Sequence, residues 1–264
     1  MTAAATKPAD VVEVDARAGR SPTVTMRGDI DFRRAPEIRK AVTKLLERGR
    51  KRIRVKLADV VFMDSSGISA LLDLAKSADE RGARLVLVSP TRQLLHLLEV
   101  SGFRSLFEFE KLPKPERPLP GPVGLPIYWQ MSEFSVPCDA ELVANIRHRV
   151  TQVAESMPFG SEEIEDIKLA VGEAAANAFR YGCPRGRADR VNVRCIGDSQ
   201  RLTVELTDAG PGFDPSLVPT PPLGSLQPGG RGIFFMRITM DEVAFSRLDR
   251  GMYVQMVKHV RAPI

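Results

Sequence analysis

Two hydrophobic periods alternate along residues 11–110. In the segment "APEIRKAVTKLLERG", apolar side chains fall on one helical stripe at Ile38, Val42, Leu45 and Leu46, and Gly49 follows as a helix stop. Shorter apolar runs are typical of strands. The pattern predicts strands at 11–16, 23–32, 52–63, 83–89 and 106–110, and helices at 35–49, from about 66, and at 91–102. We expect a mixed α/β sheet with helices against it.

The order of elements changes after residue 128. Helices are predicted at 140–156 and 161–181, with Ser161 as an N-cap, and a third at 231–240. Strands are predicted at 190–197 and 201–208, followed by a hairpin of 241–248 and 252–260 around "DRG". The strand "RLTVELT" alternates apolar and polar residues, as a half-buried strand does. We expect an α/β sandwich in which a helix layer lies on an antiparallel sheet.

Prolines separate the two halves. They occupy positions 113, 115, 118, 120, 122 and 126, a spacing that excludes a helix or a central strand. The chain is therefore predicted to hold one domain at 1–112, an extended linker at 113–127 and a second domain at 128–264.

Composition narrows the function classes. The 264 residues include no apolar run of about 20 residues, and the opening "MTAAATKPAD" lacks a signal-peptide centre, so we expect a cytoplasmic protein without a membrane segment. The net charge of +5 comes from scattered basic residues, which argues against direct nucleic-acid binding. Cys138, Cys183 and Cys195 are odd in number and far apart, so we expect reduced, structural thiols.

Two polar residues lie on one flank of the helix predicted at 161–181. Glu173 and Asn177 are one turn apart, on the flank opposite Ile167 and Val171. For such a pair alone, the solvent-exposed face of an amphipathic helix is a sufficient explanation.

Two glycine-rich segments follow in the sequence. In "DAGPGFDP", Asp208 leaves a strand and precedes Gly210 and Gly212, which permit a sharp turn or a close ligand approach. In "PGGRGIFFM", Gly230 and Gly232 stand at a helix N-terminus, where amide groups favour phosphate. Arg231 either contacts a bound phosphate group or is a solvent-facing cap residue. Each segment alone is also compatible with an ordinary turn.

Together, "EAAANAFRYG", "DAGPGFDP" and "GGRGIFFMRITMDEV" resemble the histidine-kinase-like (GHKL) ATPases, with their Bergerat-type fold, and within them the anti-sigma serine kinases. The resemblance implies Mg²⁺ and ATP as cofactors, with residues 213–229 as a lid. Asn177 would bind Mg²⁺, Asp208 the adenine amino group, Gly210 and Gly212 would shape the adenine pocket, and Gly230, Arg231 and Gly232 would bind phosphates. Glu173 would assist attack by a hydroxyl group. Met252, where the family commonly has Thr, and Tyr181, where these kinases usually have His, depart from the pattern.

The stretch "VVFMDSSGISALL" carries two serines at a helix start. Helix capping explains them locally, and a phosphate is also tolerated at such a site. With "RGDIDFRRAPEIRKAV" and "LLEVSGFRSLFEF", the stretch resembles the STAS family of anti-sigma-factor antagonists over about residues 10–110. That resemblance makes Ser66 the phosphoacceptor, with Asp31 and Asp64 as acidic neighbours and Lys56 where Asp is common.

The sequence thus predicts an ATP-dependent protein serine kinase fused to a STAS phosphoacceptor domain, which regulates transcription by partner switching. The alternative is a nucleotide-binding protein that binds ATP or ADP and sequesters a sigma factor or an antagonist without catalysis. Phosphorylation in cis or in trans, a sigma-factor partner and a homodimer all stay open.

Overall fold

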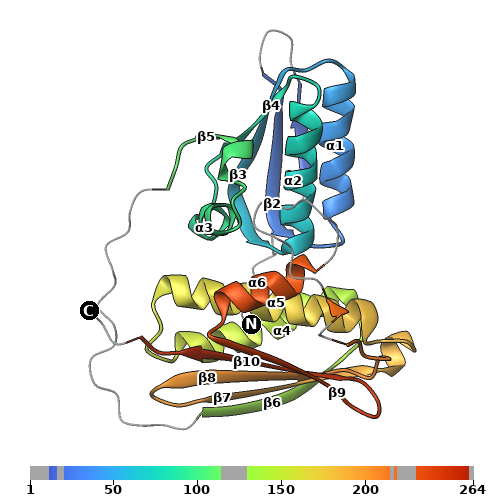
Figure 1. Ribbon diagram of the computed structural model, residues 1–264, viewed down its shortest axis with the longest axis vertical. Helices are drawn as coiled ribbons and strands as arrows, with labels where there is room; N and C mark the ends of the chain where they lie inside the picture. The colour runs from blue at the N-terminus through green and yellow to red at the C-terminus, as the bar shows by residue number, and fades with distance from the viewer. Residues whose placement is uncertain (1–11, 17–20, 114–129, 215–216, 219–229, 262–264) are drawn as a thin grey trace, which may run out of the picture. The chain divides into compact units, whose positions relative to one another are not determined.

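The computed structural model describes residues 12–16, 21–113, 130–214, 217–218 and 230–261. The described residues up to 113 belong to one compact unit and those from 130 onward to a second (Figure 1). All but the first residue of the predicted linker at 113–127 and most of the predicted lid at 213–229 lie outside the described residues. Within the described part of the chain, no helix combines the length and hydropathy that a membrane span requires.

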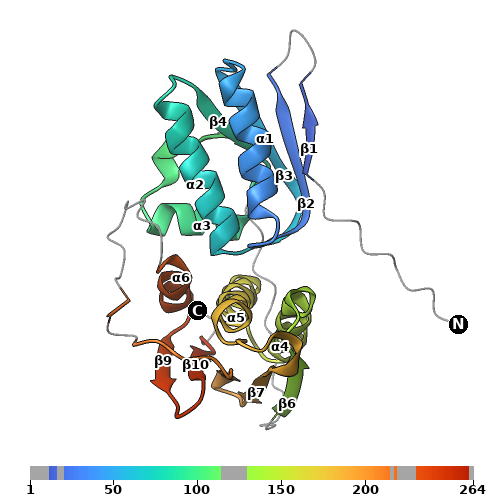
Figure 2. The ribbon, with the colours of Figure 1, turned by 90° about the vertical axis from the view of Figure 1, so that its right-hand side faces the viewer.

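The first unit is a five-stranded mixed sheet with three α-helices. Its strands run in the spatial order β1-β2-β3-β4-β5, in which only the β1–β2 pair is antiparallel. Helices α1 and α2 lie side by side against the sheet (Figure 2). The bounds are β1 Val12–Asp15, β2 Thr23–Ile30, α1 Ala35–Glu47, β3 Arg52–Met63, α2 Ser65–Asp79, β4 Arg84–Val88, α3 Arg92–Val100 and β5 Glu108–Glu110.

Helix α1 follows the predicted stripe. Ile38, Val42, Leu45 and Leu46 are all buried, and Gly49 ends the segment with φ of 71°, a conformation that glycine adopts readily. The hydrophobic period therefore predicted the buried face of this helix, and the glycine predicted where it ends to within two residues.

The second unit is a helix layer on one face of an antiparallel sheet. The strands are ordered β6-β7-β8-β10-β9, and helices α4, α5 and α6 lie side by side above them (Figure 2). The bounds are β6 Gln130–Pro137, α4 Val143–Glu155, α5 Ser161–Tyr181, β7 Arg190–Gly197, β8 Arg201–Thr207, α6 Arg231–Thr239, β9 Glu242–Arg247 and β10 Met252–His259. The predicted arrangement of a mixed sheet followed by a helix layer on an antiparallel sheet is confirmed.

The edge strand β6 was not predicted. It pairs with β7 from Gln130 to Pro137, and it places Phe134 and Val136 in the core. Only these two large apolar residues of the strand are buried, so its hydrophobic signal is short.

The N-cap residue of α5 differs from the prediction. The helix begins at Ser161 as expected, but the N-cap residue is Gly160, whose N–H donates a hydrogen bond to the Glu163 side chain.

A buried lysine fixes the two helices that carry the candidate site. Lys258 on β10 is 2% exposed, and its Nζ lies 2.9 Å from Asp166 Oδ2 in the second turn of α5. The same ammonium donates to the carbonyl of Thr239 at the end of α6, 2.5 Å away. A cation at a helix C-terminus is favourable, so Lys258 joins α5 and α6 to the sheet in a defined arrangement.

Candidate functional site

Glu173 is buried in the middle of α5. Its residue exposure is 2%, although a carboxylate is seldom buried in this way without a compensating environment. Helix α5 has α4 on one side and α6 on the other (Figure 2). The interpretation of Glu173 as part of a solvent-exposed helix face is therefore wrong, because the residue is buried. Asn177, one turn later, is half-buried.

Asp208 follows β8 and is held by two backbone groups. Its Oδ1 accepts hydrogen bonds from the N–H of Gly210 at 2.9 Å and from that of Met252 at 3.1 Å. The backbone N–H of Asp208 donates in turn to the Met252 carbonyl at 3.1 Å. Burial raises the pKa of the Asp208 carboxyl, while the two backbone hydrogen bonds oppose that rise. The carboxylate is thus fixed in orientation and partly removed from water.

Glycines surround Asp208 at distances that exclude larger residues. A Cβ on Gly182 would lie 2.3 Å from Cγ of Asp208, and one on Gly251 would lie 1.9 Å from its carbonyl oxygen. Gly251 also has φ of 105°, which disfavours an L side chain. A Cβ on Gly210 would lie 2.6 Å from Cα of Gly182. The end of α5, the Asp208 loop and the start of β10 therefore meet backbone against backbone.

The glycines predicted at a helix N-terminus lie at the start of α6. Gly230 precedes the helix with φ of 73°, and Gly232 lies in the first turn. Arg231 is 7% exposed, so the solvent-facing cap interpretation of this residue is wrong. Helix α6 packs beside α5, which brings the amide-rich helix start and the Glu173 helix into one helix layer.

The two departures from the family pattern have different structural positions. The Met252 side chain is buried at 3% exposure, while its backbone supports Asp208. Tyr181 is 64% exposed, with the Arg180 guanidinium 5.8 Å from its ring centroid. The substitution at Tyr181 thus changes the protein surface, and the substitution at Met252 changes the core.

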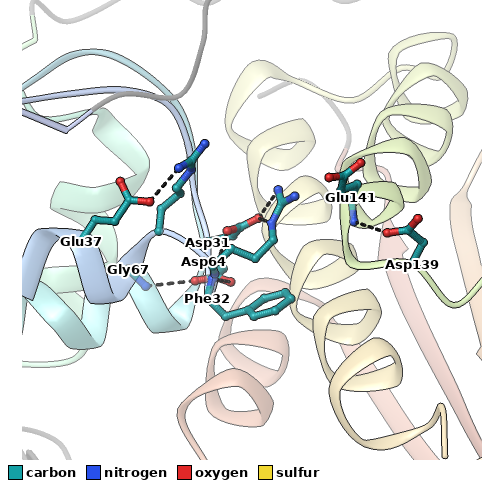
Figure 3. Close-up of polar contacts among 9 residues, drawn as sticks. Asp31, Phe32, Glu37, Asp64, Gly67, Asp139 and Glu141 are labelled. Carbon is teal, nitrogen blue, oxygen red and sulfur yellow. Dashed lines mark hydrogen bonds and ion pairs between the residues drawn. The ribbon is translucent and has the colours of Figure 1, made fainter. Parts of the chain in front are cut away.

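The N-cap residue of α2 is Asp64 rather than either serine. Its Oδ1 accepts from the N–H of Ser66 at 2.8 Å and of Gly67 at 3.0 Å, and its Oδ2 accepts from the N–H of Phe32 at 3.0 Å. Figure 3 shows Asp64 with Gly67 and Phe32. Ser65 and Ser66 occupy the first two positions of α2 and are partly exposed. Since Asp64 performs the capping, the capping explanation of the serines is wrong.

A second buried carboxylate lies near that cap. Asp31, 3% exposed, accepts from Nε of Arg33 at 2.8 Å, and its Oδ1 accepts from the Arg33 N–H at 3.0 Å. Burial, together with the neighbouring Asp31 carboxylate, raises the pKa of Asp64 to about 6, against the opposing backbone hydrogen bonds. Ser66 therefore lies at a helix N-terminus close to two carboxylates with little solvent access.

The cysteine prediction is corrected by the structure. Cys138 and Cys183 form a disulfide across a sequence separation of 45, while Cys195 is free and buried as expected. Strand β6 ends beside the start of β7, and the loop after α5 returns to that same point, so the two cysteines meet. Because β6 was not predicted, this proximity was not visible in the sequence.

The donor set is compatible with a magnesium nucleotide. Among the described residues there is no cluster of three or more His, Cys, Asp or Glu side chains that could bind a metal by itself. Mg²⁺ usually takes one or two protein oxygens and completes its shell with phosphate and water, so the half-buried amide of Asn177 suits it. Asp208 offers a carboxylate oxygen between glycines, which fits a planar amino group.

Comparison with known proteins defines the class of each unit. The family model described as "Histidine kinase-like ATPase domain" matches residues 136–258, and the STAS domain model matches residues 13–113. Both resemblances seen in the sequence are confirmed.

Relatives define the family more closely. The serine-protein kinase RsbW of Bacillus licheniformis is 33% identical over 134 residues, which cover 48% of this chain and 83% of the relative. RsbW of Bacillus subtilis is 32% identical over 136 residues, with 48% and 84% covered. The chain belongs to the RsbW serine-protein kinase family through its second unit.

Among solved structures, the unphosphorylated anti-sigma factor antagonist SpoIIAA covers 38% of this chain and 88% of its own, at 16% identity and a TM-score of 0.34.

Proposed function

We propose that this protein is an ATP-dependent serine kinase whose substrate is a serine of a STAS domain. The observation that carries the proposal is the buried Glu173 carboxylate, one helical turn from Asn177 in the helix beside α6. A carboxylate with so little water around it is suited to accept a proton from a serine hydroxyl as the hydroxyl attacks.

The nucleotide is held by the other residues of the second unit. Asp208 accepts a hydrogen bond from the adenine amino group, and Gly210 and Gly212 shape the adenine pocket by allowing close backbone approach. The oriented carboxylate and the closely packed glycines support this assignment. Asn177 holds Mg²⁺, which neutralises phosphate charge when it is bound.

The start of α6 binds the phosphates. The amides near Gly230 and Gly232 point from a helix N-terminus, which favours anions. Arg231 contributes positive charge at the same helix start, and its burial would strengthen an interaction with phosphate.

Ser66 is the proposed acceptor. It occupies the first turn of α2 and is partly exposed, so its hydroxyl group is accessible to a kinase. A phosphate would add about −1.5 to −2 charges close to Asp64 and Asp31. That charge alters the surface on which a partner docks, which is the basis of partner switching.

The remaining partners follow from the same proposal. Ser66 receives its phosphate within its own chain or from a second copy, a separate STAS protein is a further substrate, the second unit sequesters a sigma factor, and two copies pair. We place these events in the cytoplasm, where ATP and transcription factors are present.

Phosphate transfer is tested by intact mass after incubation with Mg-ATP. We expect one phosphate on the wild type and on Ser65→Ala, and none on Ser66→Ala. Glu173→Gln should still bind nucleotide but transfer none, to itself or to an added STAS domain. Tight nucleotide binding without any transfer by the wild type would overturn the kinase proposal in favour of a nucleotide-sensing interaction protein.

A further inference from the structure

The Cys138–Cys183 disulfide connects two segments of the second unit that also meet through a backbone hydrogen bond and through the Arg187–Asp139 ion pair. Cys138 follows β6, and Cys183 follows α5. The one other cysteine, Cys195, lies in β7 as a buried free thiol. The disulfide therefore joins two cysteines that have no role in the proposed phosphoryl transfer.

One end of the disulfide adjoins the Asp208 loop directly. Gly182, the residue before Cys183, accepts a hydrogen bond from the N–H of Ala209 at 3.1 Å through its carbonyl oxygen. Its Cα is so close to Asp208 that an added Cβ would lie 2.3 Å from the carboxyl carbon. A shift of the backbone at Cys183 would consequently move a group in contact with Asp208.

The opposite end of the 183–189 loop is anchored without the sulfur atoms. The Cys138 N–H donates to the carbonyl of Asp189 at 3.0 Å. The buried Asp189 carboxylate accepts from the N–H of Arg185 at 2.7 Å and from its Nε at 2.8 Å. These contacts remain when the disulfide is reduced, so reduction releases the loop chiefly at Cys183.

The two cysteine residues differ in solvent exposure. Cys138 is 8% exposed, whereas Cys183 is half-buried. An external thiolate can therefore approach Cys183 more easily, and access is one of the factors that control thiol–disulfide exchange. Disulfides that form in a reducing compartment are usually transient and redox-sensing, which is consistent with a bond that can be opened.

We propose that Cys138 and Cys183 form a reversible redox pair that controls nucleotide affinity at the Asp208 site, with tighter binding in the disulfide state. The inference rests on the proposed function, since it takes Asp208 as part of a nucleotide site. To form the bond, the two thiols lose two protons and two electrons to a low-molecular-weight disulfide, which becomes two thiols. A dithiol reductant reverses the exchange. The disulfide limits the positions of Gly182, so ADP binding orders less backbone when the bond is present.

The test compares the full chain in two redox states. One sample is treated with oxidised glutathione and the other with dithiothreitol, which is removed afterwards, and alkylation followed by peptide mass analysis assigns each cysteine as thiol or disulfide. ADP is then titrated by calorimetry under nitrogen. We expect the reduced sample to bind ADP at least about fivefold more weakly, at the lower end of measured couplings between sites.

Two variants separate the pair from general effects of oxidation. Cys183→Ser should bind ADP weakly under both treatments, while Cys195→Ala should keep the difference seen in the wild type. Wild-type dissociation constants less than about twofold apart, below the usual range of coupling, would overturn the inference. So would thiols at Cys138 and Cys183 that persist after treatment with oxidised glutathione. Absence of ADP binding in both states would overturn the proposed function itself, and this inference with it.

Discussion

Replacement of Asp208 separates the structural role of its carboxylate from its role in binding. In the folded protein, Oδ1 accepts from the N–H groups of Gly210 and Met252 at 2.9 and 3.1 Å. Asp208→Asn keeps a carbonyl oxygen for these donors but places an amide group where the second carboxylate oxygen lies. Asp208→Ala removes both oxygens.

The structure sets different magnitudes for the two variants. Burial raises the pKa of Asp208, so the fold disfavours its charge, and we expect the neutral Asn to change the free energy of unfolding by less than about 1 kcal/mol. Asp208→Ala leaves two N–H groups without this acceptor. At about 1–2 kcal/mol for each partly buried donor, the loss of stability is about 2–4 kcal/mol.

Asp208→Asn should affect ADP binding much more strongly than it affects stability. A hydrogen bond to a charged group contributes about 1.5–3 kcal/mol, so Asp208→Asn should weaken ADP binding roughly 10- to 150-fold although the fold is intact. Urea denaturation measures the stability, and calorimetric titration measures ADP affinity. Wild-type protein should also discriminate against inosine diphosphate, which carries a carbonyl in place of the adenine amino group.

A stable Asp208→Asn variant that binds ADP like the wild type would refute the assignment of Asp208 to the adenine amino group. Equal wild-type affinity for ADP and inosine diphosphate would refute it independently. Strong destabilisation by Asn would instead contradict the inferred preference of the fold for a neutral side chain.

Three further predictions concern other parts of the chain. Because the pKa of Asp64 is raised from 3.8 to about 6 in the fold, protonation favours folding, and stability should fall by on the order of 2 kcal/mol as pH rises from 4 to 6; Asp64→Asn should lose this part of the pH dependence of urea denaturation, and an unchanged dependence would contradict it. Lys258→Met leaves Asp166, whose side chain is 23% exposed, without its cation, so urea denaturation should show a loss of about 2–4 kcal/mol, with partial recovery in Lys258→Met/Asp166→Asn; no recovery would show that the ion pair is not the cause. If Ser66 is phosphorylated within its own chain, the fraction modified per minute should not change on tenfold dilution, whereas a proportional fall would indicate transfer between chains.

Local patterns in the sequence predicted the elements that local chemistry controls. The stripe of α1 and the glycine at its end required only nearest neighbours on one helix. Asp208 and Gly230 were recognisable because each stands where a regular element ends or begins, and the structure gives both the expected local geometry.

Features that depend on distant neighbours were missed. The burial of Glu173 was one such feature, because the sequence of α5 alone does not reveal the tertiary packing around this residue. Asp64 caps α2 in place of the serines, and its Oδ2 also accepts a hydrogen bond from the N–H of Phe32, a residue 32 positions earlier. The Cys138–Cys183 disulfide depends on the pairing of β6 with β7, and β6 has too few buried apolar residues to be recognised.

The central claim, that separate segments of the second unit form one site for a magnesium nucleotide, is tested most directly by hydrogen exchange. Mass spectrometry would compare amide exchange with and without Mg²⁺ and a non-hydrolysable ATP analogue. We predict slower exchange together in the peptides that contain Asn177, Asp208 to Gly212 and Gly230 to Gly232, all with the same dependence on analogue concentration. Protection confined to one of these segments, or found only outside them, would contradict the account.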